Sequence, residues 1–163
     1  MTNDMTRITS WLQPQEIVLD VDVSDQAGAL KFIADSVSHA HGLDAESIFR
    51  ALSRREQSSS TALGDGFAIP HTRIGGIERP LTLFIRTKHG LAFHAPDGKP
   101  VCDLLAILVP MDGDKDDHLH LLSLVVRLFS DRDFRRKLDS APDALAAEGL
   151  FRAAIERFSA EVS

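Results

Sequence analysis

The chain has 163 residues, of which 44% are hydrophobic and 26% are charged, and these proportions are typical of one globular domain with a sizeable core. Its formal net charge of −6 argues against a nucleic-acid-binding protein, which would need a clustered basic surface. No apolar run approaches the roughly 18 residues that cross a bilayer, and the N-terminal segment lacks a signal-peptide core, so we expect a cytoplasmic protein without membrane insertion.

The first quarter of the chain predicts a turn, a strand and a helix. A single turn is expected at residues 8–12, and residues 17–23 have the Val and Ile content of a strand. Ser24 is a candidate N-cap for a helix whose apolar residues recur at helical spacing. Gly42 stands where that helix would end.

A second helix is expected to lead into a polar loop. It should begin at Asp44 and bring Arg54 and Arg55 to its end, just before the hydroxyl-rich segment at residues 58–61. Guanidinium and hydroxyl groups are donors that stabilise phosphoryl oxygens. This loop is therefore a candidate part of an anion site.

The stretch GDGFAIPH, residues 64–71, is the most informative part of the sequence. A short buried strand is predicted at residues 67–69, because these residues are apolar and Pro70 biases its predecessor toward an extended backbone. His71 is then expected where that strand ends, with its imidazole at the surface. A neutral imidazole, with an unperturbed pKa of roughly 6.5, is a nucleophile that can take a phosphoryl group on nitrogen.

Two glycines in this stretch complete the candidate phosphate site. Gly64 and Gly66 permit positive φ and have no Cβ, so their amides can approach an anion closely. With Ser60, Thr61 and the pair Arg54-Arg55 they would stabilise a phosphoryl group in transit. The same residues also suit an ordinary turn in which the histidine merely follows a strand, because a lone GxG is a weak signal.

Several strands are expected in the middle of the chain. Residues 81–87 alternate and branch like a strand, and residues 91–93 suggest a further short one. A turn follows at residues 96–99, and the continuous apolar run at residues 104–109 is typical of a central strand covered on both faces. Residues 72–79, which contain two adjacent glycines, are expected to form a mobile loop.

The last third of the chain predicts helices and completes an α/β pattern. An acidic loop at residues 112–117 leads into a helix near residues 118–129, and two more helices are expected around residues 133–138 and 142–160. Strands interleaved with helices predict one α/β domain with helices on both faces of the sheet. The single cysteine, Cys102, has apolar neighbours and predicts a buried thiol in a reducing compartment.

A second histidine-containing segment, DGDKDDHLHLL at residues 112–122, has three interpretations. It lacks the glycine and the glutamate of a calcium loop, and His118 and His120 would project about 200° apart on a helix, so no metal site is predicted. If Asp116 or Asp117 caps the helix, His118 lies in the first turn, where an anion is favoured. Alternatively, both histidines simply face solvent.

The ordered set of motifs resembles the enzyme IIA proteins of the phosphoenolpyruvate-dependent phosphotransferase system, fructose/mannitol type, and most of all their nitrogen-regulatory members. The resemblance covers most of the chain, which we take as one domain with a core from about residue 8 to about residue 155. It is carried by the following segments: Arg55-Glu56, Ser60-Thr61, GDGFAIPH ending at His71, PVCDLLAILVP at residues 100–110 and HLHLLSLV at residues 118–125.

The resemblance implies a small mixed β-sheet between helices and a phosphohistidine carrier that needs no cofactor. His71 would be phosphorylated by a small histidine-phosphorylated carrier of the HPr/NPr kind, with Arg55 and His118 beside the phosphoryl group and the amides near Gly64 and Gly66 contacting it. The leading expectation is a regulatory protein. One alternative is a sugar-specific IIA component that passes phosphate to a fructose- or mannitol-type IIB. The other is a binding module that works without phosphate, against which the three retained side chains argue.

Overall fold

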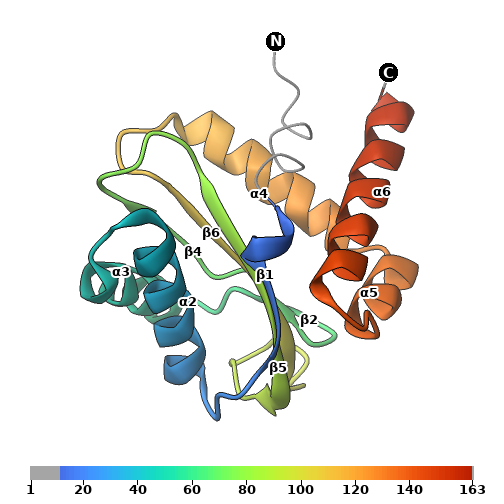
Figure 1. Cartoon of the computed structure of the whole chain (residues 1–163), viewed down its shortest axis with the longest axis horizontal. Coiled ribbons are helices and arrows are strands. Elements are labelled where there is room, and N and C mark those ends of the chain that lie inside the picture. Colours follow the sequence, from blue (N-terminus) through green and yellow to red (C-terminus); the bar gives the residue numbers. More distant parts are fainter. Residues whose placement is uncertain (1–11, 163) are drawn as a thin grey trace.

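The computed structural model describes residues 12–162, except for the side chains of residues 158–162, so the turn predicted at residues 8–12 lies outside the described residues apart from Leu12. Its centre is a six-stranded mixed sheet (Figure 1). The strand order is β1-β5-β6-β3-β2, and β4 also pairs with β6. The bounds are β1 Ile17–Val21, β2 Ala62–Gly64, β3 Phe67–Ala68, β4 His71–Ile74, β5 Leu81–Leu91 and β6 Val101–Pro110.

Helices cover both faces of this sheet, as predicted. In Figure 1, α2 and α3 lie together on one side, and α4, α5 and α6 lie on the other. A short 3-10 helix, η1, precedes β1. The bounds are η1 Pro14–Glu16, α2 Gln26–His41, α3 Ala45–Ser58, α4 Lys115–Phe129, α5 Arg132–Asp139 and α6 Ala144–Val162.

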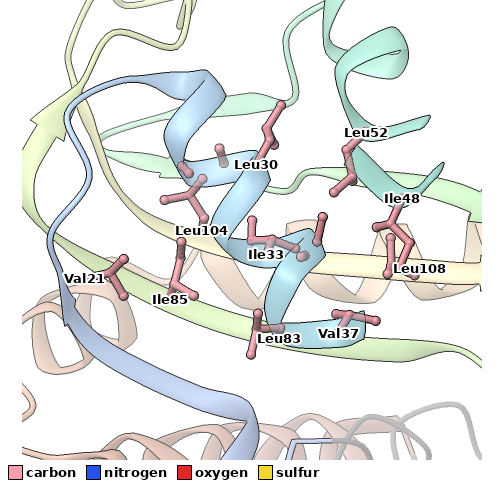
Figure 2. Close-up of a cluster of buried hydrophobic side chains, with 14 of the residues drawn as sticks. Val21, Leu30, Ile33, Val37, Ile48, Leu52, Leu83, Ile85, Leu104 and Leu108 are labelled. Atoms are coloured by element: carbon pink, nitrogen blue, oxygen red, sulfur yellow. The ribbon is translucent and has the colours of Figure 1, made fainter. Parts of the chain in front are cut away.

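The apolar run of β6 explains the two layers of core. Leu104 and Leu108 face α2 and α3, whereas Leu105 and Ile107 face α4, α5 and α6. Figure 2 shows the first of these layers, in which side chains of α2 and α3 point onto strands of the sheet. Each fully buried leucine or isoleucine contributes roughly 1.5–3 kcal/mol of transfer free energy, so both faces of the sheet stabilise the position of β6.

The helix boundaries follow capping chemistry, with two corrections to the sequence predictions. Asp25, and not Ser24, caps α2 by accepting a hydrogen bond from the amide of Gly28 at 2.7 Å. The predicted stop at Gly42 is confirmed, because its φ of 67° is left-handed. Asp44 caps α3, as predicted. At α4 the cap is Asp114, so this helix begins earlier than either Asp116 or Asp117 would allow.

Two predicted strands have different limits in the structure. The first ends at residue 21, and Asp20, with a φ of 58°, forms an irregularity within it before pairing with β5 resumes at Val21. Of the short strand predicted at residues 91–93, only Leu91 lies in a strand, and it is the last residue of β5, which continues from residue 81 to residue 91. Cys102 on β6 is half-buried, and not fully buried as its apolar neighbours suggested.

The most important difference concerns the backbone around His71. Both β3 and β4 run parallel to β6 in one register, with Phe67 opposite Asp103 and His71 opposite Ile107. Between them the carbonyl of Pro70 accepts a hydrogen bond from the amide of Ile107 at 2.9 Å. His71 therefore lies within an extended segment and not at its end, and residues 72–74 continue the strand where a mobile loop was predicted.

Candidate functional site

The imidazole of His71 is held in one orientation by its own strand. Its Nδ1 lies 2.8 Å from the carbonyl oxygen of Ile69. Because a carbonyl can only accept, Nδ1 carries the proton and Nε2 keeps its lone pair. The backbone thus selects Nε2 as the nucleophilic nitrogen.

Arg55 approaches that same nitrogen from the last turn of α3. Its Nε donates to Nε2 of His71 at 3.3 Å, while its Nη1 donates to the carbonyl oxygen of Ser59 at 2.8 Å and to the Ser59 hydroxyl at 3.2 Å. These contacts fix the guanidinium beside the lone pair. A phosphoryl group on Nε2 would therefore meet a preoriented cation.

His118 lies on the other side of His71 and comes from α4. The two ring centroids are 5.6 Å apart, with 49° between the ring planes. The amide of His118 bonds to the carbonyl of Asp114, so the residue follows directly after the free amides at the start of the helix. Within residues 12–157, the buried Nδ1 of His118 has no hydrogen-bond partner. The candidate site therefore contains one unsatisfied nitrogen, on the ring that lies next to that of His71.

Both histidines are kept neutral by their surroundings. Burial lowers the pKa of His71, the charges of Arg55 and His118 lower it further, and only the bond to the Ile69 carbonyl acts in the opposite direction. Burial also lowers the pKa of His118, followed by the charges of Arg73 and Arg55. A neutral imidazole is the form that attacks phosphorus, so this electrostatic environment favours phosphoryl acceptance.

Arg73 is a charged neighbour of the site that the sequence analysis did not select. It follows His71 by two residues on β4, and its Nη1 donates to three carbonyl oxygens, those of Pro110 at 3.3 Å, Met111 at 3.4 Å and Gly113 at 3.0 Å. The period-two alternation of a strand would have predicted that His71 and Arg73 share a face, but the segment was expected to be a loop.

The structure does not bring the two predicted hydroxyl groups to His71. Ser60 Oγ donates to the carbonyl oxygen of Phe93 at 2.7 Å. The hydroxyl and the amide of Thr61 both donate to the buried carboxylate of Glu56. Thr61 therefore binds back to α3 and Ser60 to the segment after β5, whereas Arg55 and His118 lie next to His71.

The two predicted glycines form the turn between β2 and β3, away from His71. Gly64 and Gly66 have positive φ values of 97° and 88°, as their position in a tight turn requires. Phe67, the residue after this turn, precedes His71 by four residues in the same register, or roughly 13 Å along the strand. At this turn Asp65 already pairs with Lys99 and Arg135, and its amide donates to the carboxylate of Asp97.

No metal centre is present in the described part of the chain, where no group of three or more His, Cys, Asp or Glu residues has the arrangement to hold an ion. His120 is exposed and bonds to the carbonyl of Asp116, so it does not join His118. Nor is any helix among the described residues long and apolar enough to cross a membrane. The four other histidines are all exposed, as predicted: His39, His41, His89 and His94.

Comparison with known proteins agrees with this geometry. A family model described as the phosphoenolpyruvate-dependent sugar phosphotransferase system, EIIA 2, matches residues 10–150. The chain belongs to this EIIA family. It is thus a component of a phosphotransferase system, and the resemblance stated from its motifs is confirmed.

Relatives of this EIIA protein include regulatory and sugar-specific members. A nitrogen regulatory protein of Pseudomonas aeruginosa is 33% identical over 93% of this chain and 97% of that protein. A fructose-specific EIIA component of Haloferax volcanii is 31% identical over 94% and 99%. The crystal structure of nitrogen regulatory protein IIA-Ntr from Neisseria meningitidis superposes with a TM-score of 0.84 and 32% identity, covering 89% and 99% of the two chains. The mixed-sheet fold is therefore that of the family.

Proposed function

We propose that this EIIA protein carries a phosphoryl group on Nε2 of His71. The observation that supports this most directly is the pair of contacts on the ring, since Nδ1 is bound to the Ile69 carbonyl and Nε2 faces Arg55. The ring is therefore in the tautomer and orientation that in-line attack on phosphorus requires.

In the proposed step, a donor phosphohistidine of an HPr/NPr-type carrier approaches His71. The phosphorus–nitrogen bond of the donor breaks as a bond from phosphorus to Nε2 forms, and the donor imidazole leaves with the electron pair. Because Nε2 has a single lone pair, Arg55 must release it before the bond to phosphorus forms and would then donate to a phosphoryl oxygen, with the ring of His118 next to that of His71. The transfer needs no metal or cofactor from this protein.

We assign a regulatory role to the phosphorylated and free forms. Relatives of similar length are named nitrogen regulatory proteins, and one solved structure carries the name IIA-Ntr. A phosphoryl group adds about −1.5 to −2 charges at a half-buried surface site, which is enough to change which partner protein binds. A cytoplasmic location belongs to the same proposal and is supported by the free thiol of Cys102.

The test is phosphorylation of the purified protein with phosphoenolpyruvate and the donor enzymes of the general or nitrogen branch. Acid-labile, alkali-stable phosphate should appear on His71, and its NMR signature should place it on Nε2. His71→Ala should take up no label, and His118→Ala should remain folded but accept phosphate more slowly. Normal labelling of His71→Ala would disprove the assignment, and wild-type rates for His118→Ala would remove that residue from the mechanism.

A sugar-specific role is the second candidate, and it is favoured by the 31% identity to a fructose-specific EIIA component. In that case phosphate on His71 would pass to a fructose- or mannitol-type IIB acceptor. Adding such an IIB protein and its sugar to the phosphorylated chain separates the two roles. Rapid sugar-dependent loss of label would establish transport, and a stable label would favour regulation.

A further inference from the structure

A cavity of about 430 Å³ lies beside the phosphoryl site and is not explained by phosphotransfer. His118 forms part of its wall, but neither Arg55 nor His71 lines it. Its volume is in the range of small-molecule sites. The residues around it come from β4, from the segment between β4 and β5, from the end of β6, and from the segment that leads into α4 and the first turns of that helix.

Two arginines line this cavity without a carboxylate partner. Arg73 is held through Nη1 by three backbone carbonyls, so its Nε and Nη2 remain for another acceptor. Arg79 lies on the exposed segment before β5. Among the described residues, neither arginine forms an ion pair, although the charge of Arg79 acts on Glu16. This part of the cavity is suited to a carboxylate, which a guanidinium binds through two parallel hydrogen bonds.

The same cavity also contains carboxylates and apolar surface. Asp114 and Asp117 extend from the start of α4, and Glu78 adds a third negative charge. Apolar surface comes from Pro80 and Pro110, which line its wall and are half-buried. A ligand with negative charge alone, such as inorganic phosphate, would satisfy the arginines but would also face these carboxylates.

We propose that this cavity binds a small α-amino acid with an apolar side chain. Its carboxylate would pair with Arg73 and Arg79, its ammonium group with Asp114 and Asp117, and its side chain would lie against Pro80 and Pro110. Each of the three chemical features of the cavity then has a counterpart on the ligand. His118 would connect this site to the phosphoryl site, because it borders both.

Binding can be tested on the unphosphorylated protein in the absence of a donor, so the result does not depend on the proposed phosphotransfer. L-Leucine is the probe, and two analogues each carry half of its charge pair: 4-methylpentanoate and 3-methylbutylamine. Saturable NMR shifts are expected at the amides of Gly113 and Leu121, with each analogue at least about tenfold weaker. No saturable shift by leucine, or equal binding by either analogue, would overturn the proposal.

Substitutions of the charged side chains distinguish leucine binding in this cavity from nonspecific association of leucine with the protein. Arg79→Gln should weaken leucine binding at least about tenfold, whereas Arg132→Gln, an exposed arginine on α5 that does not line the cavity, should have no effect. Asp117→Asn should weaken leucine but not 4-methylpentanoate, since only leucine has an ammonium group. Wild-type leucine binding by both Arg79→Gln and Asp117→Asn would place the ligand elsewhere.

Discussion

Nε of Arg55 donates to Nε2 of His71 at 3.3 Å, although the two residues belong to different elements, the last turn of α3 and the start of β4. The contact is possible because β4 pairs with β6 alone among the described strands, which leaves its other edge open to α3. In the unphosphorylated protein, Nε of Arg55 thus lies where a phosphoryl group on Nε2 would be.

Arg55→Lys should reduce the rate of phosphoryl acceptance about 10²- to 10³-fold while leaving the fold intact. A lysine keeps the charge but loses the planar fork that binds Ser59 and Nε2 at once. The initial rate of label uptake measures the effect. Arg54→Lys, an exposed neighbour on the same helix, is the matched control and should behave as wild type. An unchanged rate for Arg55→Lys would show that charge alone suffices.

The pKa of His71, measured from its ring NMR signals, should lie below the usual value of about 6.5. Burial is the main cause, so Arg55→Gln should raise this pKa only in part. The unfolded chain then binds more protons than the native chain below about pH 6.5, and the contribution of His71 to the free energy of unfolding falls as the pH decreases. A His71 pKa above 6.5 in the native protein would contradict the inference that burial lowers this pKa.

Thr61→Val should destabilise the protein by about 1–3 kcal/mol, because it leaves one oxygen of the buried Glu56 carboxylate without its hydroxyl donor. Ser58→Ala removes an exposed hydroxyl nearby and should change the free energy of unfolding by less than about 0.5 kcal/mol. Urea denaturation of both variants gives the comparison. Equal stability of the two variants would show that the Glu56–Thr61 contact is not needed.

Asp103→Asn should become more stable relative to wild type as the pH rises from about 4 to about 8. Burial, with Asp139 nearby, raises the pKa of Asp103 to about 8, so the native state holds a proton that the unfolded chain has already lost. The stability contribution of protonated Asp103 is complete below about pH 4 and is lost by about pH 8. The asparagine avoids this loss, which is on the order of a few kcal/mol. If denaturation gave the same difference in free energy of unfolding between Asp103→Asn and wild type at pH 4 and at pH 8, the effect would be excluded.

The fold could be predicted because local and long-range signals agree. The apolar run of β6 indicated a strand covered on both faces, and Gly42 and Asp44 marked helix limits correctly. One helix boundary was wrong because two neighbouring residues offer the same chemistry. Ser24 and Asp25 can both cap a helix, and only the packing of α2 decides between them.

The site was less accessible to sequence reasoning, because its members meet only in the folded chain. The residue pattern around His71 indicated an anion site, whereas the roles of Arg55 and His118 came from the family resemblance. The pattern could not show that the hydroxyl of Thr61 belongs to Glu56, since a count of donors does not reveal their acceptors. Arg73 was detectable by strand alternation, but only after residues 72–74 were known to be a strand.

The common register of β3 and β4 makes the spacing from Phe67 to His71 a fixed length in this protein. Odd-numbered residues of this segment face α4, and Ile74 faces α2 and α3. An insertion of one residue between Ile69 and His71 would therefore rotate the imidazole to the opposite face of the sheet, away from His118. Such a chain would keep every residue of the candidate site and yet lose their arrangement, so the number of residues here matters as much as their identity.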